Sequence, residues 1–521
     1  MSLFAKRVGK TEAFVLVLVL MVAIYAFFCA EAHCFKAVSL CLACIASVGA
    51  FWVLDRWLRV RHENAVARFI FPVALVLAGV VSALFMPAGS IPDELYHYYH
   101  SYEYASALMG LDTHAIRAED VSAFVTNGGF LTTSIGVDGW NYVKEHICDE
   151  VTTGVVSIES LTAVNPQALS ASANVSLSSE LPQLRLFSAA GIALGRIIGL
   201  NHVAVFYLGR LFNLLWGSAL VVFAVRLAPI GKNIMMVAAL FPMTIQLIGS
   251  YSYDCGTIGF AFLCIALALK VAFGKEGPSK KTLIAFLVVA ALMVPCKPVY
   301  VSLPLVALFA PDGRFSTKRK AWAFRLAVVL VPVVAVMLTR MGDVTGVVAG
   351  DASDGVAYFS ATSFWADPVG CFVMLVNTVE VYGSFWLQGI SGDSLGWFQV
   401  NTSYPDYVSF FLLLGLCLAS ICSHDDDYVL PSIARCGFGV FFLISAAGIV
   451  LSMWLAWTSA DSKIIEGVQG RYFIPVLPVL MLALRPKGMR ADYSFAFPLV
   501  IGTYAVTLSG LAYISIRCLG V

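Results

Sequence analysis

Reactive side chains are concentrated in the segment Ile91–His100, which directly follows a long apolar stretch. It contains two adjacent carboxylates, Asp93 and Glu94, together with two histidines and three tyrosines. If a helix starts here, Asp93 and His97 are i,i+4 neighbours on one face. A carboxylate in this setting can act as a general base toward a hydroxyl group. The alternative is a helix N-cap, although a cap needs only one of the two acids.

Three later positions add charges of both signs. Asp254 ends the polar segment Ser250–Asp254, and Lys297 lies between two short apolar runs. Arg471 belongs to the segment Glu466–Pro475, whose glycines allow close backbone approach. Its guanidinium offers a fork of donors suited to phosphate. Simpler interpretations stay open: Asp254 as an interfacial acid or helix cap, and Arg471 as a cation that reaches toward the membrane surface.

Acids and cations of this kind, facing one compartment, suit an enzyme that breaks a sugar–phosphate bond. One carboxylate would deprotonate the acceptor hydroxyl. The cations would balance the charge that develops on the leaving phosphate. Aromatic pairs such as Trp454 and Trp457 could stack on sugar rings, but an aromatic belt at the membrane interface explains them equally well.

Composition places these segments in a membrane protein. Of 521 residues, 60% are apolar and 12% are charged, and the mean hydropathy is +0.84. Soluble chains carry about 45–50% apolar and about 25% charged residues. Apolar runs long enough to cross a bilayer as helices predict an all-α polytopic fold. The net charge of +1 gives no hint of a nucleic-acid partner, and the 13 cysteines show no zinc-ligand spacing.

The distribution of Lys and Arg predicts the topology. With the N-terminus inside, the short basic connections face the cytoplasm, as the positive-inside rule requires. Two long loops, 88–202 and 340–404, then lie outside, and we expect 187–200 and 370–390 within them to form interfacial helices. About thirteen spans are predicted, at residues 12–30, 37–54, 69–87, 203–225, 233–250, 256–274, 282–296, 298–311, 321–339, 405–422, 434–456, 472–485 and 493–516.

These spans divide the chain into three regions. Residues 1–68 hold two N-terminal spans and a basic cytoplasmic loop, 69–490 form the membrane core with both long loops, and 491–521 hold a C-terminal span. The reactive segments all fall in the core, on the outer side in this topology.

The order of the motifs resembles a family of bacterial multispanning membrane proteins labelled as a domain of unknown function. That family is similar in plan to the GT-C glycosyltransferases. The resemblance covers about residues 70–490. It rests on the Pro-Asp-Glu motif with its following histidine and on four further segments, which are Glu180–Gln183, Arg210–Leu215, Phe241–Asp254 and Gly467–Pro475.

This resemblance implies a GT-C-like fold with an extracytoplasmic active site in the bacterial plasma membrane. The implied donor is a polyprenyl-phosphate sugar, the acceptor is a glycan or a lipid-linked molecule, and the transfer inverts the sugar. On the matching positions Asp93 is the catalytic base, Glu94 a second acid or a metal ligand, and Asp254 a further acid. Substrate-binding roles fall on Arg471, Lys297, His97, Gln469, Tyr472 and Glu180. The sequence indicates no metal site, and the cofactor is unknown.

Two other classes of function compete with this interpretation. A transporter or flippase for lipid-linked saccharides would favour charges at mid-membrane depth and broken helices in repeated halves. The polar motifs gather at one face instead, and no internal repeat is visible. A non-catalytic membrane scaffold with the same fold is the third class.

Overall fold

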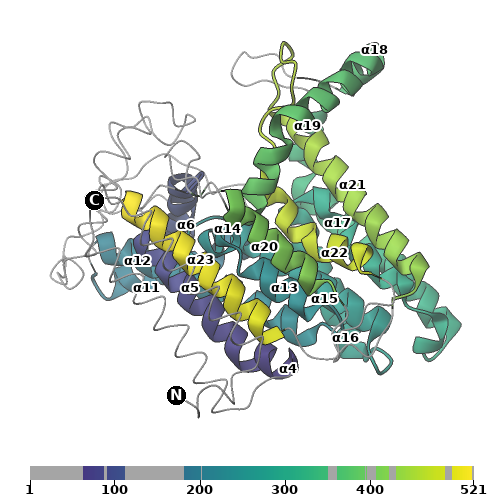
Figure 1. The fold of residues 1–521 in the computed structure, drawn as a ribbon, viewed down its shortest axis with the longest axis horizontal. Helices are drawn as coiled ribbons and strands as arrows, with labels where there is room; N and C mark the ends of the chain where they lie inside the picture. The colour runs from purple at the N-terminus through teal and green to yellow at the C-terminus, as the bar shows by residue number, and fades with distance from the viewer. Residues whose placement is uncertain are drawn as a thin grey trace, which may run out of the picture.

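The computed structural model consists of helices joined by turns (Figure 1). It describes residues 63–86, 91–111, 181–200, 202–349, 359, 361–392, 395, 406–421, 430–486 and 496–518. The two spans expected at 12–30 and 37–54, and most of the first long loop, lie outside the described residues.

The described elements follow one another without a strand. From residue 63 to residue 296 they are α4 (Glu63–Ala65), η1 (Val66–Ile70), α5 (Phe71–Phe85), α6 (Glu94–Leu108), α11 (Pro182–Ile197), α12 (His202–Leu227), α13 (Lys232–Ala239), α14 (Pro242–Ile248), α15 (Asp254–Phe273) and α16 (Lys280–Cys296). The remainder are η3 (Pro298–Tyr300), η4 (Leu303–Phe309), η5 (Asp312–Arg314), α17 (Lys318–Ala349), α18 (Ala361–Ala366), α19 (Pro368–Ser391), α20 (Asp406–Ala419), α21 (Ser432–Ala456), η6 (Gly470–Val476), α22 (Leu477–Leu484) and α23 (Ala496–Cys518). The η elements are 3-10 helices except η1, which is a π-helix.

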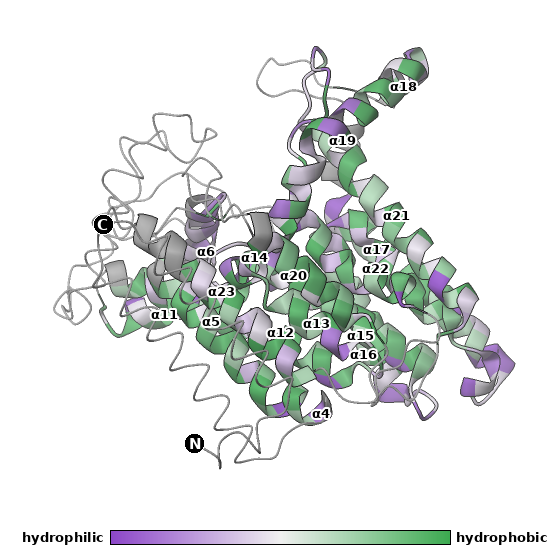
Figure 2. Cartoon of the chain, viewed as in Figure 1, coloured by the Kyte–Doolittle hydropathy of each residue, from purple (hydrophilic) through white to green (hydrophobic). Residues whose placement is uncertain are grey.

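Apolar residues dominate the long helices (Figure 2). Six described helices are long and apolar enough to cross a membrane, namely Val66–Leu84, Ala204–Leu227, Asp254–Phe273, Lys318–Arg340, Pro368–Ser391 and Ser432–Ala456. Shorter apolar helices cover Pro298–Phe309, Val408–Ala419, Gly470–Leu484 and Ala496–Leu511. The chain is therefore an all-α membrane protein, as its composition predicts.

Prolines divide several of the expected spans. The run 233–250 forms two helices, α13 and α14, because Phe241 is extended before Pro242 and a residue before proline avoids the helical region. The runs 298–311 and 472–485 contain 3-10 helices, with prolines at the starts of η3 and η4 and with Pro475 inside η6. Proline lacks the N–H that a continuous α-helix uses, so apolar length alone did not predict these interruptions.

Helix α15 is the centre of the packing. In its spanning window 89% of the residues are buried, against 61% or less in the other five. It packs against α12, α16 and η4. Gly259 allows the close approach of α12, because an added Cβ there would lie 2.7 Å from the side chain of Leu220.

The helices α15 and α16 run between two ends of the helix bundle, and we name each end after a residue that lies there. At the Asp254 end α15 begins and α16 finishes, whereas at the Lys280 end α15 finishes and α16 begins. Helix α17 continues past the Asp254 end, because Arg340 donates to the Pro295 carbonyl at 3.2 Å well before α17 ends.

The helix expected at 187–200 is α11, which packs against α6 and α12. Gly191 permits this contact, since an added Cβ would lie 2.7 Å from the Leu208 carbonyl. The helix expected at 370–390 is α19, one of the six that are long and apolar enough to cross a membrane. Its interfacial position stays a prediction.

Candidate active site

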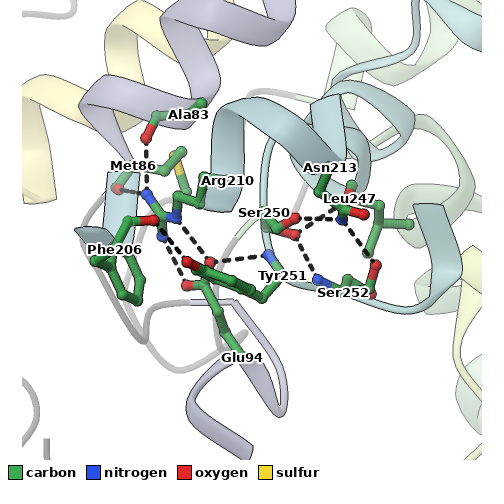
Figure 3. Close-up of polar contacts among 10 residues, drawn as sticks. All are labelled: Ala83, Met86, Glu94, Phe206, Arg210, Asn213, Leu247, Ser250, Tyr251 and Ser252. Carbon is green, nitrogen blue, oxygen red and sulfur yellow. Dashed lines mark hydrogen bonds and ion pairs between the residues drawn. The ribbon is translucent and has the colours of Figure 1, made fainter. Parts of the chain in front are cut away.

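A buried ion pair fixes the start of α6 at the Asp254 end (Figure 3). Arg210 of α12 donates from Nε to Glu94 Oε1 at 2.8 Å and from Nη2 to Oε2 at 2.7 Å. Its Nη1 donates to the carbonyls of Ala83 and Met86 at the end of α5. Both charged side chains are fully enclosed. One guanidinium from within α12 thus joins the end of α5 to the start of α6.

The same pair holds the segment that leads into α15 (Figure 3). The backbone N–H of Tyr251 donates to Glu94 Oε1 at 3.3 Å, and the Tyr251 hydroxyl donates to the Phe206 carbonyl at 2.7 Å. Asn213 of α12 donates to the Ser250 carbonyl at 2.6 Å. These contacts set the position from which Asp254 begins its helix.

Asp93 adopts an unusual backbone conformation beside this pair. Its φ of 61° and ψ of 13° are left-handed, and it is the non-glycine residue with positive φ among the described residues. Asp93 occupies the N-cap position of α6, as the alternative expects, but its carboxylate makes no capping bond there, and its side chain is 54% exposed. Conformations of this kind cost energy and gather at functional sites.

Two carboxylates and two cations meet at this point. Lys297 Nζ lies 2.7 Å from Asp254 Oδ1, which is a short ion pair. Arg471 Nε lies 3.6 Å from Asp254 Oδ2, and Arg471 Nη2 lies 3.9 Å from Asp93 Oδ2. Lys297 and Asp254 are thus in direct hydrogen-bonding contact, whereas the two contacts of Arg471 are longer than hydrogen bonds.

Arg471 reaches this position through a close contact between η6 and α19. A Cβ on Gly470 would overlap the Trp386 carbonyl, so the glycine is required there. Trp386 Nε1 donates to the Val468 carbonyl at 3.0 Å, and the Tyr300 hydroxyl donates to the Tyr472 carbonyl at 2.7 Å.

The guanidinium of Arg471 is buried but incompletely bonded. Its Nε has no hydrogen-bond partner among the described residues, and neither has the buried Oε1 of Gln469. Buried polar atoms are nearly always paired, so each orphan requires an explanation. A bound ligand with its own acceptor oxygens would satisfy the Arg471 donor.

Aromatic rings surround the cations. Lys297 Nζ lies 4.2 Å from the ring centre of Tyr472 and 4.8 Å from that of Tyr253. Burial lowers the pKa of Lys297, but the Asp254 carboxylate and the nearby tyrosines outweigh it, so the net pKa is raised. Burial also raises the pKa of Tyr253, to about 12. Lys297 is therefore charged and Tyr253 neutral near pH 7.

His97 lies next to this group, with its ring 4.8 Å from that of Tyr253. Its pKa is well below the ordinary value, first because the ring is buried and then because Arg185 is close. The Arg185 guanidinium contacts Nδ1, and arginine can only donate. The imidazole is thus neutral, with Nδ1 as acceptor and its hydrogen on Nε2.

The structure brings together five of the residues selected from the sequence, which are Asp93, Asp254, Lys297, Arg471 and Tyr472. Glu94 has another place: both of its oxygens accept from Arg210, so we assign it to the framework and not to the reaction. Glu180 lies outside the described residues. Among the described residues no three His, Cys, Asp or Glu side chains are grouped to hold a metal ion.

Two residues that lie against this group, Arg185 and Tyr253, were not selected from the sequence. A usable signal existed for Arg185, because an arginine within an apolar helix is costly and marks a functional position or a specific partner. Tyr253 offered no such signal, since tyrosines are common at membrane interfaces.

The framework role of Glu94 predicts a stability effect. Glu94→Gln keeps the shape but leaves the Arg210 charge buried without its counter-ion, a loss of about 3–5 kcal/mol. We expect a sharply reduced yield and melting temperature in detergent. Asp93→Asn, at the adjacent exposed position, should retain both. Equal destabilisation by the two variants would contradict the assignment.

His97 predicts a pH dependence of stability. Below about pH 6.5 the unfolded chain binds a proton at His97 and the folded chain does not. Stability therefore falls as the pH falls below that value, by at most about 1.4 kcal/mol per pH unit. The loss of melting temperature between about pH 7.5 and about pH 5.5 should be smaller in His97→Gln than in the wild type. Identical losses in both would show that His97 does not contribute.

Comparison with known proteins gives a family. No curated protein and no solved structure matches the chain. A family model described as "Predicted membrane protein (DUF2142)" matches residues 75–480, which is more than half of the chain and includes all five of the grouped residues. The chain therefore belongs to this family of membrane proteins.

Proposed function

We propose that this protein is an inverting glycosyltransferase that moves a sugar from a polyprenyl-phosphate donor to a cell-envelope acceptor. The observation that supports it most is the open pair at the Asp254 end, where the half-exposed carboxylate of Asp93 faces the buried guanidinium of Arg471 at 3.9 Å. In an inverting transfer a base and a phosphate-binding cation act from opposite sides of the transferred sugar, so in the proposed complex the half-exposed Asp93 side chain turns away from Arg471 to admit the donor between them.

Of the two cations at the site, we assign Arg471 to the donor phosphate, because Lys297 is already paired with a carboxylate. Asp254 is already engaged by Lys297 at 2.7 Å, whereas its distance to Arg471 Nε is 3.6 Å. Phosphate oxygens are suited to the donors of a guanidinium, which can bind two of them at once. The apolar helices beside Arg471 would hold the polyprenyl chain, so that the phosphate reaches the site from within the bilayer.

In the proposed reaction Asp93 takes the proton from an acceptor hydroxyl. The acceptor oxygen attacks the anomeric carbon of the sugar from the face opposite the phosphate. As this bond forms, the bond from the anomeric carbon to the phosphate oxygen breaks, and the electron pair leaves with the phosphate. Arg471, with Lys297 behind it, stabilises that charge. Attack from the opposite face inverts the anomeric centre.

The basic residues favour an extracytoplasmic site. Lysines and arginines gather at the Lys280 end, opposite the site, and include Lys275, Lys280, Lys281, Lys318, Arg319 and Lys320. Because basic connections prefer the cytoplasm, the Asp254 end would face outward. Charged groups at one end of the helices also favour an enzyme over a transporter or flippase, which would place them at mid-depth.

Asp93→Asn tests the catalytic base. The variant should fold and bind donor normally, because the side chain is half-exposed and makes no capping bond. Sugar transfer should fall by about 10²–10⁴-fold, the usual contribution of a general base. The assay measures release of polyprenyl phosphate from a panel of radiolabelled polyprenyl-phosphate sugars by protein in nanodiscs. Near-normal turnover by the variant would remove Asp93 from the reaction.

Arg471 variants test the phosphate site through donor affinity. Arg471→Lys keeps the charge but loses the fork, so affinity should weaken, and Arg471→Ala should weaken it further. Lys463→Ala, which removes an exposed cation from the preceding segment, is the control and should change nothing. Unchanged donor binding by a folded Arg471→Ala protein would leave Arg471 a structural residue and withdraw the main support for the proposal.

A further inference from the structure

A cavity of about 540 Å³ lies between α21 and α22, far from the candidate active site. It belongs to the Lys280 end of the bundle, because Phe438 of α21 packs there on Phe273 and Phe309. Its volume falls within the range of about 300–1,000 Å³ that is usual for ligand sites. It is lined by Ser432, Arg435, Cys436, Gly439, Phe442, Leu443, Leu480, Ala483 and Leu484.

Arg435 provides the charge of this cavity. Its Nε donates to the Ala483 carbonyl at 3.2 Å, which satisfies one carbonyl left open at the end of α22. The structure gives it no carboxylate partner within the described residues. Four further N–H donors of the guanidinium are therefore held in a fixed position beside the cavity.

The first turn of α21 adds to the positive potential. Ser432 begins this helix of 25 residues, and both Ser432 and Arg435 line the cavity. Open backbone N–H groups and the helix dipole favour an anion at such a terminus. Arg435 and the helix start thus provide two independent features that favour a negatively charged group.

The rest of the cavity is an apolar groove. Gly439 keeps it open, because an added Cβ there would meet only the Cβ of Ala483, at 3.9 Å. Leu443 and Leu484 are 64% and 61% exposed along its sides. From Ser432 to Leu443 the groove follows α21 for about 16 Å, at about 1.5 Å per residue.

We propose that this cavity binds an anionic phospholipid. Its phosphate lies against Arg435 and the first turn of α21, and one acyl chain follows the groove past Gly439. A membrane lipid fits better than a soluble anion, because the groove continues from the cation as a long apolar surface within a membrane protein. The site is independent of the proposed sugar transfer.

The experiment measures retained lipid. Protein in nanodiscs of equal parts phosphatidylglycerol and phosphatidylcholine is released gently and examined by native mass spectrometry. The wild type should retain phosphatidylglycerol in preference by at least about tenfold, a difference of about 1.4 kcal/mol. Arg435→Ala should remove the preference, and Arg435→Lys should keep part of it. Equal retention of both lipids by the wild type would overturn the proposal.

Two variants separate the headgroup site from the groove and from general effects. Gly439→Leu fills the groove and should reduce retention of phosphatidylglycerol although Arg435 is present. Arg325→Ala is the matched control, because Arg325 also bonds a helix-end carbonyl, that of Ala310, but is paired with Asp312. It should bind lipid like the wild type. Normal retention by Gly439→Leu, or equal losses in Arg325→Ala and Arg435→Ala, would overturn the proposal.

Discussion

The buried pair of Glu94 and Arg210 is the interaction on which the candidate site depends. Removing two charges from water is costly, and their attraction repays the cost only with good geometry and further hydrogen bonds. Here the pair is bidentate, and Arg210 also bonds the carbonyls of Ala83 and Met86. The result is a fixed junction of α5, α6 and α12, and the left-handed Asp93 is attached to it.

The neighbouring charges differ in how completely they are paired. Asp254 and Lys297 form a closed pair at 2.7 Å, which the dipole at the start of α15 also favours. Arg471 has longer contacts to Asp254 and Asp93, and its Nε is unbonded among the described residues. In an apolar layer such an arrangement is costly without a ligand, which is why we place the donor phosphate at Arg471.

Each end of the helices carries an arginine beside apolar side chains, but the surroundings of the two arginines differ. At the Asp254 end, a cation lies among carboxylates and aromatic rings, which suits a substrate that must react and leave. At the Lys280 end, Arg435 lies at the head of an apolar groove with no carboxylate partner among the described residues. That arrangement suits an amphipathic molecule that stays bound.

The sequence by itself determined the all-α membrane class, because apolar length and the scarcity of charge are local properties of the chain. It also selected Asp93, Asp254, Lys297 and Arg471, since charged residues at the ends of apolar runs are conspicuous. Only the tertiary structure separated Asp93 from its neighbour Glu94. Adjacent residues at a helix start point in different directions, and the partner of Glu94 is 116 positions away. No local pattern specifies a pairing over that distance, because it arises from how α6 and α12 pack.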